Sequence, residues 1–228
     1  PPREIQASIF VDEDGDLATE RHFDVRSGGE LHLSFLKLTG GNVASNNLRG
    51  GSILVDGAAA ILTVAHSIFG GCVETTLIAV HMPCARFGGS VSISGSARAV
   101  FLESTFVGSS ALSGGALHVN GANTSVEIVR GNFSSNRALG RSGTDNDGDG
   151  LGLGGAIFVE GGRLTLNMTF FYANSASVAG MHIYQEQPTA LDKQTSTFAV
   201  CAPGTFAPLP TKVMSVDVVT FMGCPQLC

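Results

Sequence analysis

The strongest constraint on this chain is a unit of sequence that occurs twice in the same order. Residues 154–176 read GGAIFVEGGRLTLNMTFFYANSA, and residues 114–138 read GGALHVNGANTSVEIVRGNFSSNRA. Each copy has a glycine pair, two short alternating strands, a phenylalanine, and an asparagine three residues further on. Because a repeated unit of this length with two or three strands stacks on its neighbours, the pattern predicts a β-solenoid.

Looser copies of the unit extend the pattern upstream and downstream. The expected glycine pairs are Gly28-Gly29, Gly50-Gly51, Gly88-Gly89, Gly114-Gly115 and Gly154-Gly155, with a degenerate Ala179-Gly180. The expected inward pairs after the glycines are Ile53/Val55, Val91/Ile93, Leu117/Val119, Ile157/Val159 and Met181/Ile183. The expected inward pairs of the second strands are Leu62/Val64, Val100/Leu102, Val126/Ile128 and Leu164/Leu166, and the corner phenylalanines are Phe69, Phe106, Phe133 and Phe171.

These copies favour an all-β fold, a right-handed parallel β-helix with a short cysteine-rich C-terminal tail. Equivalent strands of such a coil pair about 4.8 Å apart, so equivalent side chains stack along the axis. We expect Phe to lie on Phe, and Asn136 and Asn174 to turn inward and bind backbone groups of neighbouring rungs. A β-sandwich with glycine-rich turns is the alternative, but it gives no reason for the order of residues to recur.

The pattern divides the chain into three parts. Residues 1–27 are expected to form an N-terminal cap or hairpin, because the first rung of a solenoid otherwise exposes a strand edge. Residues 28–198 are the predicted parallel β-helix, and residues 199–228 are the cysteine-rich tail. Two rungs carry insertions, near residues 72–84 and 140–153.

Composition limits the setting and the partners. A net charge of −6 argues against a nucleic-acid surface, which needs clustered Lys and Arg. No apolar run reaches the roughly 18 residues of a membrane span, so we expect no membrane insertion. Five cysteines and three acceptor sequons, at Asn123, Asn132 and Asn167, predict an extracellular or cell-surface glycoprotein carrying N-linked glycans. The chain begins with Pro1, so we expect a processed product or a piece of something longer.

The cysteines suggest a disulfide framework. Cys72 and Cys84 bracket an insertion that a disulfide between them would close. Cys201 and Cys224 lie in the tail, in a stretch typical of the opening of a small disulfide module. Since five cysteines leave one over, we expect Cys228 to pair beyond the end of this chain.

The acidic insertion is a candidate metal site. Asp145, Asp147 and Asp149, followed by Gly150, match the first half of a calcium loop, in which alternating carboxylates converge on one cation. Ala156 stands at the twelfth position where an EF-hand needs Glu, which excludes that motif. The alternative is a solvated Gly/Asp-rich loop. No other cofactor is required.

A catalytic role is not expected. Polysaccharide-cleaving sites need paired carboxylates, or calcium-binding acids beside a base. The outward positions of the first strands are instead expected to hold Leu54, Ser92, His118, Phe158 and His182. We expect His118 and His182 to be exposed at equivalent positions two rungs apart, too far from each other to share a metal ion.

The motifs also carry a family resemblance. GGAI with Phe171-x-x-Asn174, and GGAL with Phe133-x-x-Asn136, resemble the repeats of polymorphic outer membrane proteins, within the pectin-lyase-like class of right-handed parallel β-helices. Phe69 and Phe106 depart from the pattern, since Cys72 and Ser109 stand where the family shows Asn. The CAPGTF tail is similar to the start of ephrin-receptor-like cysteine-rich repeats. The resemblance implies adhesion, surface display or fibre building, and it brings no catalytic residues.

The sequence therefore predicts a non-catalytic, extracellular structural or adhesive domain that associates with itself into a filament or surface appendage. A head-to-tail contact that does not close would produce such a filament. The alternative is a carbohydrate-binding or polysaccharide-cleaving β-helix.

Overall fold

All regular structure in the described part of the chain is β-strand. The computed structural model describes residues 3–6, 10–11, 17–18, 21–43, 49–71, 83–140, 152–186, 191–193 and 197–198. Within them the strands form four parallel sheets and one antiparallel pair, β2 (Phe10–Val11) with β3 (Leu17–Ala18).

Each parallel sheet collects strands that are far apart in sequence. Sheet 1 consists, in spatial order, of β4 (Phe23–Val25), β7 (Ile53–Asp56), β11 (Val91–Ser94), β15 (Leu117–Val119), β19 (Ile157–Val159) and β23 (Ile183–Gln185). Sheet 2 consists of β5 (Glu30–Ser34), β8 (Ile61–Ala65), β12 (Arg98–Leu102), β16 (Ser125–Val129), β20 (Arg163–Asn167) and β24 (Leu191–Lys193).

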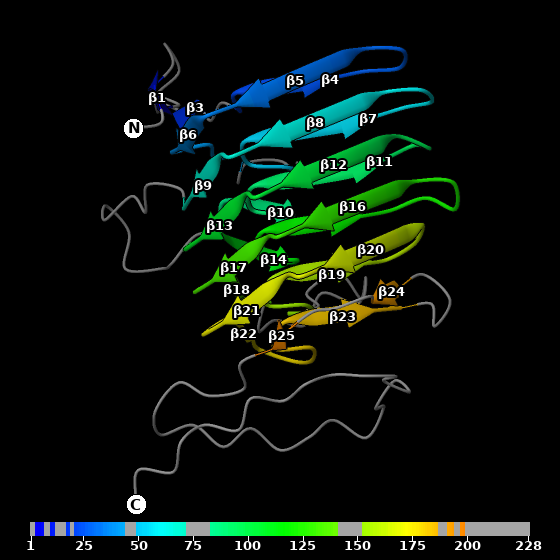
Figure 1. Ribbon diagram of the computed structural model, residues 1–228. Helices are drawn as coiled ribbons and strands as arrows, with labels where there is room; N and C mark the ends of the chain where they lie inside the picture. Colours follow the sequence, from blue (N-terminus) through cyan, green and yellow to red (C-terminus); the bar gives the residue numbers. More distant parts are fainter. Residues whose placement is uncertain are drawn as a thin grey trace, which may run out of the picture.

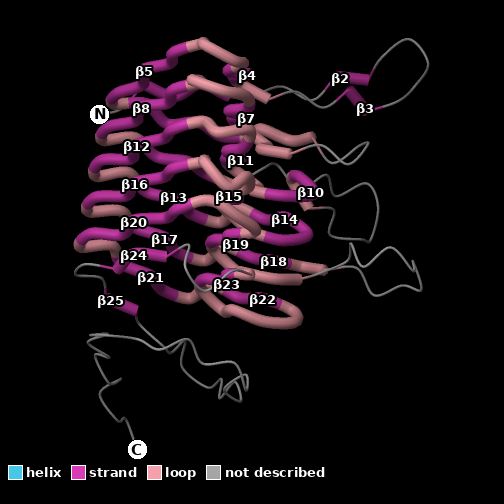
Figure 2. The backbone as a smooth tube through the Cα atoms, turned by 90° about the vertical axis from the view of Figure 1, so that its right-hand side faces the viewer, coloured by secondary structure: helices cyan, strands magenta, loops and turns pink. Residues whose placement is uncertain are grey.

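Sheets 3 and 4 are built in the same way. Sheet 3 consists of β1 (Arg3–Gln6), β6 (Leu36–Thr39), β9 (Ile68–Gly70), β13 (Thr105–Val107), β17 (Asn132–Ser134), β21 (Phe170–Tyr172) and β25 (Thr197–Phe198). Sheet 4 consists of β10 (Ala85–Phe87), β14 (Ser110–Ser113), β18 (Arg137–Ala138) and β22 (Ser175–Ala176). The chain visits sheets 1, 2 and 3 in turn, and from β10 onward also sheet 4, before it returns to sheet 1. Each circuit, here called a rung, lies beside the previous one (Figures 1 and 2).

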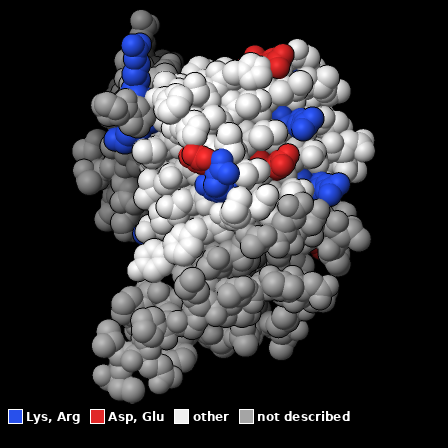
Figure 3. Space-filling model, viewed as in Figure 1, with Lys and Arg blue, Asp and Glu red and all other residues white. Residues whose placement is uncertain are grey.

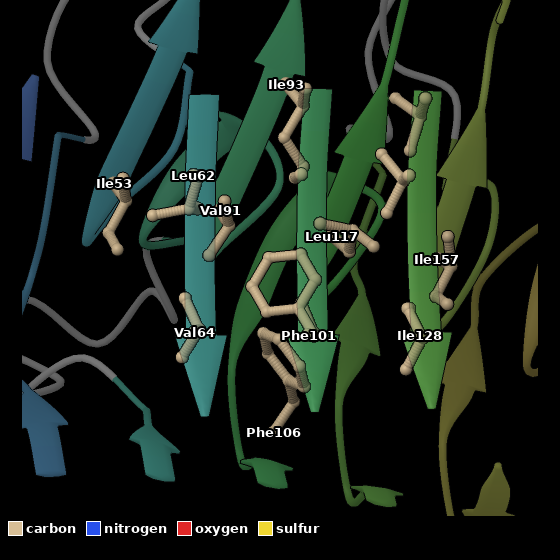
Figure 4. Packing of buried hydrophobic residues seen from close by; sticks show 14 of the residues in the cluster. Ile53, Leu62, Val64, Val91, Ile93, Phe101, Phe106, Leu117, Ile128 and Ile157 are labelled. Carbon is tan, nitrogen blue, oxygen red and sulfur yellow. The ribbon is translucent and has the colours of Figure 1, made fainter. Parts of the chain in front are cut away.

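The core lies inside these rungs, where equivalent side chains stack. Ile53, Val91, Leu117 and Ile157 occupy one register position of sheet 1 and are all fully buried. Figure 4 shows aliphatic side chains from sheets 1 and 2 meeting Phe101 and Phe106 in the interior. The predicted inward pairs of β7, β11, β15 and β19 are therefore confirmed.

A column of stacked phenylalanines lies on the inner side of sheet 3; the stacking was predicted, but the rings come from the middle of the strands and not from a corner. The ring centroids of Phe69 and Phe106 lie 4.6 Å apart, those of Phe106 and Phe133 4.5 Å, and those of Phe133 and Phe171 5.1 Å, with nearly parallel planes. Burying each ring removes a large apolar surface from water, which is worth roughly 1.5–3 kcal/mol per side chain before entropy is subtracted.

The glycine pairs serve two different purposes. The first glycine of the pair has a positive φ of 63° to 67° in Gly50, Gly88, Gly114 and Gly154, a conformation that L side chains rarely adopt. The second glycine allows close stacking. A Cβ on Gly89 would lie 2.3 Å from the carbonyl oxygen of Gly115, and one on Gly115 would lie 2.1 Å from that of Gly155.

The asparagine prediction is also confirmed. Asn136 Nδ2 donates to the carbonyl of Phe106 at 3.0 Å, and Asn136 Oδ1 accepts from the backbone N–H of Ser109 at 3.0 Å. Asn174 Nδ2 donates to the carbonyl of Phe133 at 2.9 Å. These amides therefore bind backbone groups of the preceding rung.

The predicted inward pair of β12 was wrong, and in the pair Met181/Ile183 only Ile183 was right, since it pairs with Ile157 and packs against the core. In β12, Ala99 and Phe101 are fully buried, whereas Val100 and Leu102 face outward and are half-buried. In the last described circuit, Ile183 and Gln185 pair with Ile157 and Val159, so Met181 is not part of the strand. Gly180 takes the corner conformation of Gly154, and Met181 stands where the other rungs have their second glycine.

The first rung begins earlier than the glycine pattern indicated. Phe23 pairs with Ile53 in sheet 1, so the rung starts within residues 1–27. β1 also pairs in parallel with β6 of sheet 3. Gly28 and Gly29 therefore lie in the bend between β4 and β5, not at the corner that precedes sheet 1.

Candidate functional site

The structure leaves several predicted site residues outside its described ranges. Asp145, Asp147 and Asp149, the candidate calcium ligands, are among them, as are Cys72, Cys201, Cys224 and Cys228. Cys84 is described, is fully buried and is disulfide-bonded. In the described ranges, no three His, Cys, Asp or Glu side chains are grouped so that they could hold a metal ion.

The three sequon asparagines lie on different parts of the surface. Asn123 is exposed in the bend between β15 and β16. Asn132 and Asn167 are half-buried, Asn132 on the outer side of sheet 3 and Asn167 at the end of β20 in sheet 2. Each remains a predicted glycosylation site.

The outer side of sheet 1 differs from the prediction. Leu54, Ser92, His118 and Phe158 were expected at the surface, yet all four are buried. They are buried because the region of sheet 4 folds against that side. Phe87, at the end of β10, stacks on the His118 ring at 4.8 Å and on Phe158 at 6.2 Å.

His118 and His182 also do not share a register position. His118 pairs with Phe158, which pairs with Tyr184, so Tyr184 occupies the position expected for His182. His182 instead contacts Asn174, with Nδ1 3.3 Å from Nδ2 of that residue.

Polar side chains from three rungs, two buried and one partly exposed, form a chain of contacts at His118. His118 Nδ1 lies 3.1 Å from Ser92 Oγ, and His118 Nε2 lies 3.0 Å from Glu160 Oε2. Since the carboxylate can only accept, Nε2 carries the hydrogen and the hydroxyl of Ser92 donates to Nδ1. The three residues, here called the Ser92–His118–Glu160 relay, form hydrogen bonds across three successive rungs.

Electrostatic effects favour this protonation state, with a neutral His118 and an ionised Glu160. Burial lowers the pKa of His118, against the opposing effect of Glu160, and this favours the neutral imidazole. The hydrogen bond from His118 lowers the pKa of Glu160, and the positive charges of Arg49 and Arg86 act in the same direction. Both arginines also lie over the Phe87 ring, with guanidinium carbons 5.6 Å and 5.2 Å from its centroid.

The relay has the residue types of a nucleophile, a base and an acid, but not the accessibility that catalysis requires. Ser92 and His118 are fully buried, so a substrate cannot reach the hydroxyl. Moreover, Ser92 donates its hydrogen to a histidine held between two phenylalanines, an arrangement that fixes side chains in place. The relay therefore stabilises the packing between sheet 1 and the sheet 4 region.

The outer side of sheet 3 carries an exposed aromatic pair. Phe170 and Tyr172 lie on the same side of β21, and each is 41% exposed. Their rings are nearly parallel, at 14°, with centroids 6.5 Å apart. Met168 precedes them and is 52% exposed. No role was predicted for these residues from the sequence. The available signal was the alternation within Phe170-Phe171-Tyr172, in which only Phe171 belongs to the core column.

A second surface feature is a column of left-handed residues at the corner between sheets 2 and 3. Phe35, His66, Glu103, Arg130 and Met168 each follow the last residue of a sheet 2 strand, and all have φ between 48° and 55°. Neighbours in the column interact. Phe35 stacks on His66 at 4.8 Å, His66 Nδ1 lies 3.0 Å from Glu103 Oε2, and Glu103 forms an ion pair with Arg130.

The face that includes sheet 2 and this corner has few charged side chains for its area (Figure 3). Most of the described surface in that view is neither acidic nor basic. A large neutral, strand-built face suits contact with another neutral surface better than it suits binding of a polyanion.

The structure contains no helix, within its described residues, that is long and apolar enough to cross a membrane. Searches against family models, curated proteins and solved structures found no match to this chain.

Proposed function

We propose that the chain is a right-handed parallel β-helix domain of an extracellular structural or adhesive protein, which associates with further copies into a filament or surface assembly. The observation that carries the proposal is the constant register of the rungs. Each circuit adds one strand to sheets 1, 2 and 3, and equivalent residues pair without a shift from β7 to β19. A body of uniform cross-section is suited to extension along its axis.

The ends of the sheets support association along that axis. Within the described ranges, sheet 1 ends at β4 and β23, and sheet 2 ends at β5 and β24. The outermost strand of a parallel sheet can pair with a strand of another chain. Head-to-tail contacts of this kind build filaments where they do not close into a ring.

The polar clusters support a structural role. Ser92, His118 and the Asn136–Asn174 pair are buried, and the relay and the pair each join neighbouring rungs. Both clusters hold the coil together, and their buried groups offer no place for a substrate. The repeats resemble those of polymorphic outer membrane proteins, and the tail resembles ephrin-receptor-like repeats, which favours a surface-displayed protein.

Calcium is proposed as a ligand of the insertion at Asp145, Asp147 and Asp149. Carboxylates at alternate positions followed by glycine suit a hard cation. Chelation should then lower the melting temperature of the protein, and substitution of all three Asp by Asn should remove that effect.

Assembly is tested by native mass spectrometry and negative-stain electron microscopy on the secreted protein over a range of concentrations, with and without calcium. We expect linear oligomers or filaments whose subunit mass includes sugar. Dispersed monomers under all of these conditions would contradict the proposal.

The alternative is a carbohydrate-binding or polysaccharide-cleaving protein, and the exposed Phe170–Tyr172 pair is the observation that favours it. Aromatic rings on a flat face suit contact with sugar rings, because the C–H face of a sugar ring is apolar and can pack on an aromatic ring. Incubation with polygalacturonate-type polymers distinguishes the two functions, and we expect neither turnover nor tight binding.

A further inference from the structure

The aromatic pair of sheet 3 lies in register with a glycosylation sequon. On β17, Asn132 and Ser134 are the acceptor and the hydroxyl residue of the sequon Asn132-Phe133-Ser134. On the neighbouring strand β21, Asn132 pairs with Phe170 and Ser134 pairs with Tyr172. Two functional groups of a sequon thus lie directly beside two exposed aromatic rings.

We propose that Phe170 and Tyr172 form the surface on which the core sugars of an N-linked glycan on Asn132 pack. The inference rests on the proposed extracellular, glycosylated state of the protein. It goes beyond that state because it names the acceptor whose sugar is ordered and the side chains that order it.

The exposure of the rings is the first support. Phe171, between them, is fully buried in the core column, so Phe170 and Tyr172 point outward by strand alternation. Two exposed rings beside an exposed methionine form an apolar patch, and such patches on a folded surface mark contacts with another molecule. The neutral face of an N-acetylhexosamine matches this patch, since the surrounding outward positions of β13 and β17 are Thr105, Val107, Asn132 and Ser134, none of them charged.

The orientation of Asn132 is the second support. Asn132 Oδ1 is buried and has no hydrogen-bond partner, while the residue as a whole is half-buried. The outward part of the amide is therefore its nitrogen, which is the atom that carries an N-linked sugar. Neighbouring parallel strands lie about 4.8 Å apart, so a sugar attached at Nδ2 can lie over the Phe170 ring without any rearrangement of the backbone.

The other two sequons lack this setting. Asn123 stands in a bend next to Gly121 and Ala122, with no aromatic residue beside it in sequence. Asn167 pairs with Val129 at the end of sheet 2. A glycan on Asn123 therefore serves as the matched control, because it should extend into solvent without protecting the aromatic pair.

Hydroxyl-radical footprinting of protein secreted from eukaryotic cells, read by peptide mass spectrometry, tests the proposal. The same digests report sugar occupancy at each sequon. We compare the natural protein with Asn132→Gln and Ser134→Ala, which remove the sequon in different ways, and with Asn123→Gln. We expect oxidation of Phe170 and Tyr172 to be several-fold faster in Asn132→Gln and Ser134→Ala than in the natural protein and Asn123→Gln, with Tyr184 unchanged throughout.

Each other result overturns the inference in a recognisable way. Equal oxidation rates with Asn132 occupied mean that the sugar does not lie on the rings. An unoccupied Asn132 in a secreted protein with sugar on Asn123 removes the acceptor but leaves the extracellular proposal standing. Protection that persists in Asn132→Gln and is lost on dilution assigns the patch to a second copy of the chain. Retention inside the cell with all three sequons empty contradicts the proposed function itself.

Discussion

Asn136 and Asn174, one rung apart, are hydrogen-bonded to each other through their side chains. Asn136 Nδ2 donates to Asn174 Oδ1 at 2.9 Å, and the same oxygen accepts the backbone N–H of Asn136, also at 2.9 Å. Asn136 therefore binds groups of both the preceding and the following rung, and the pair forms a polar column inside the corner.

Replacing Asn136 with Ala should destabilise the protein markedly. The change leaves the N–H of Ser109 and the carbonyl of Phe106 without their partner in a buried site, and each orphaned group costs about 1–3 kcal/mol. Guanidinium unfolding followed by circular dichroism measures the loss. Asn123→Ala, at an exposed bend, is the control, and an equal effect of both changes would contradict the role of the column.

Adjacent phenylalanines on β21 should respond very differently to truncation. Phe171 is fully buried and stacks on Phe133, so Phe171→Ala should lower the free energy of unfolding by about 3–5 kcal/mol. Phe170 points outward, so Phe170→Ala should change it by less than about 1 kcal/mol. Thermal unfolding of the two variants checks the difference. Similar losses would mean that the side of the strand facing the core is misassigned.

Alanine substitution should separate a glycine at which a Cβ would clash from a glycine that only has a positive φ. Gly89→Ala should prevent folding, because its Cβ would overlap the carbonyl oxygens of Gly115 and Ser110. Gly108 has a positive φ but open space around a Cβ, and Ser135 and Ala173 adopt the same conformation at the equivalent corner. Gly108→Ala should therefore cost only about 1 kcal/mol. Soluble yield and unfolding curves distinguish these outcomes.

Stability should fall as the pH is lowered. Burial lowers the pKa of His118 in the folded state, so below the unfolded value of about 6.5 the unfolded chain binds a proton that the folded chain resists. Glu160 adds to the trend, since its folded pKa is also lowered and its contribution disappears as the pH falls further. His118→Gln should flatten the dependence of the unfolding free energy between pH 8 and pH 5, taken as rough limits around that value. Asn123→Gln, at an exposed bend, changes no titratable group and should leave the slope unchanged.

Much of the repeat could be predicted because identical geometry in every rung demands similar residues. The phenylalanine column, the glycine corners and the inward asparagines follow from that demand. Which side of β12 faces the core could not be predicted, because both alternating sets of residues, Ala99/Phe101 and Val100/Leu102, are apolar. Phe101 faces inward beside the small Ala99, where its ring meets Phe69 and Phe106.

The candidate site was harder to predict than the core. Sheet 4 consists of strands as short as the two residues Arg137–Ala138, which leave almost no periodic signal. If sheet 4 is not predicted, the alternation of β15 places His118 on an outer surface. In the structure Phe87 and Phe158 enclose it. The pairing of the Asn132 sequon with Phe170 and Tyr172 depends on how two neighbouring rungs are aligned. That alignment cannot be read directly from a single sequence.

The corner between sheets 2 and 3 limits which insertions and deletions the sequence can accept during evolution. From β8 to β21 every such corner is two residues long, a left-handed exposed residue followed by a small one, as in His66-Ser67, Glu103-Ser104, Arg130-Gly131 and Met168-Thr169. The extra length of the longer rungs, by contrast, falls between sheet 3 and the next strand of sheet 1. A whole rung could thus be duplicated or deleted, and a foreign loop inserted on the variable side, without disturbing the stacks. A single residue added at the two-residue corner would instead put every later side chain out of step with its column.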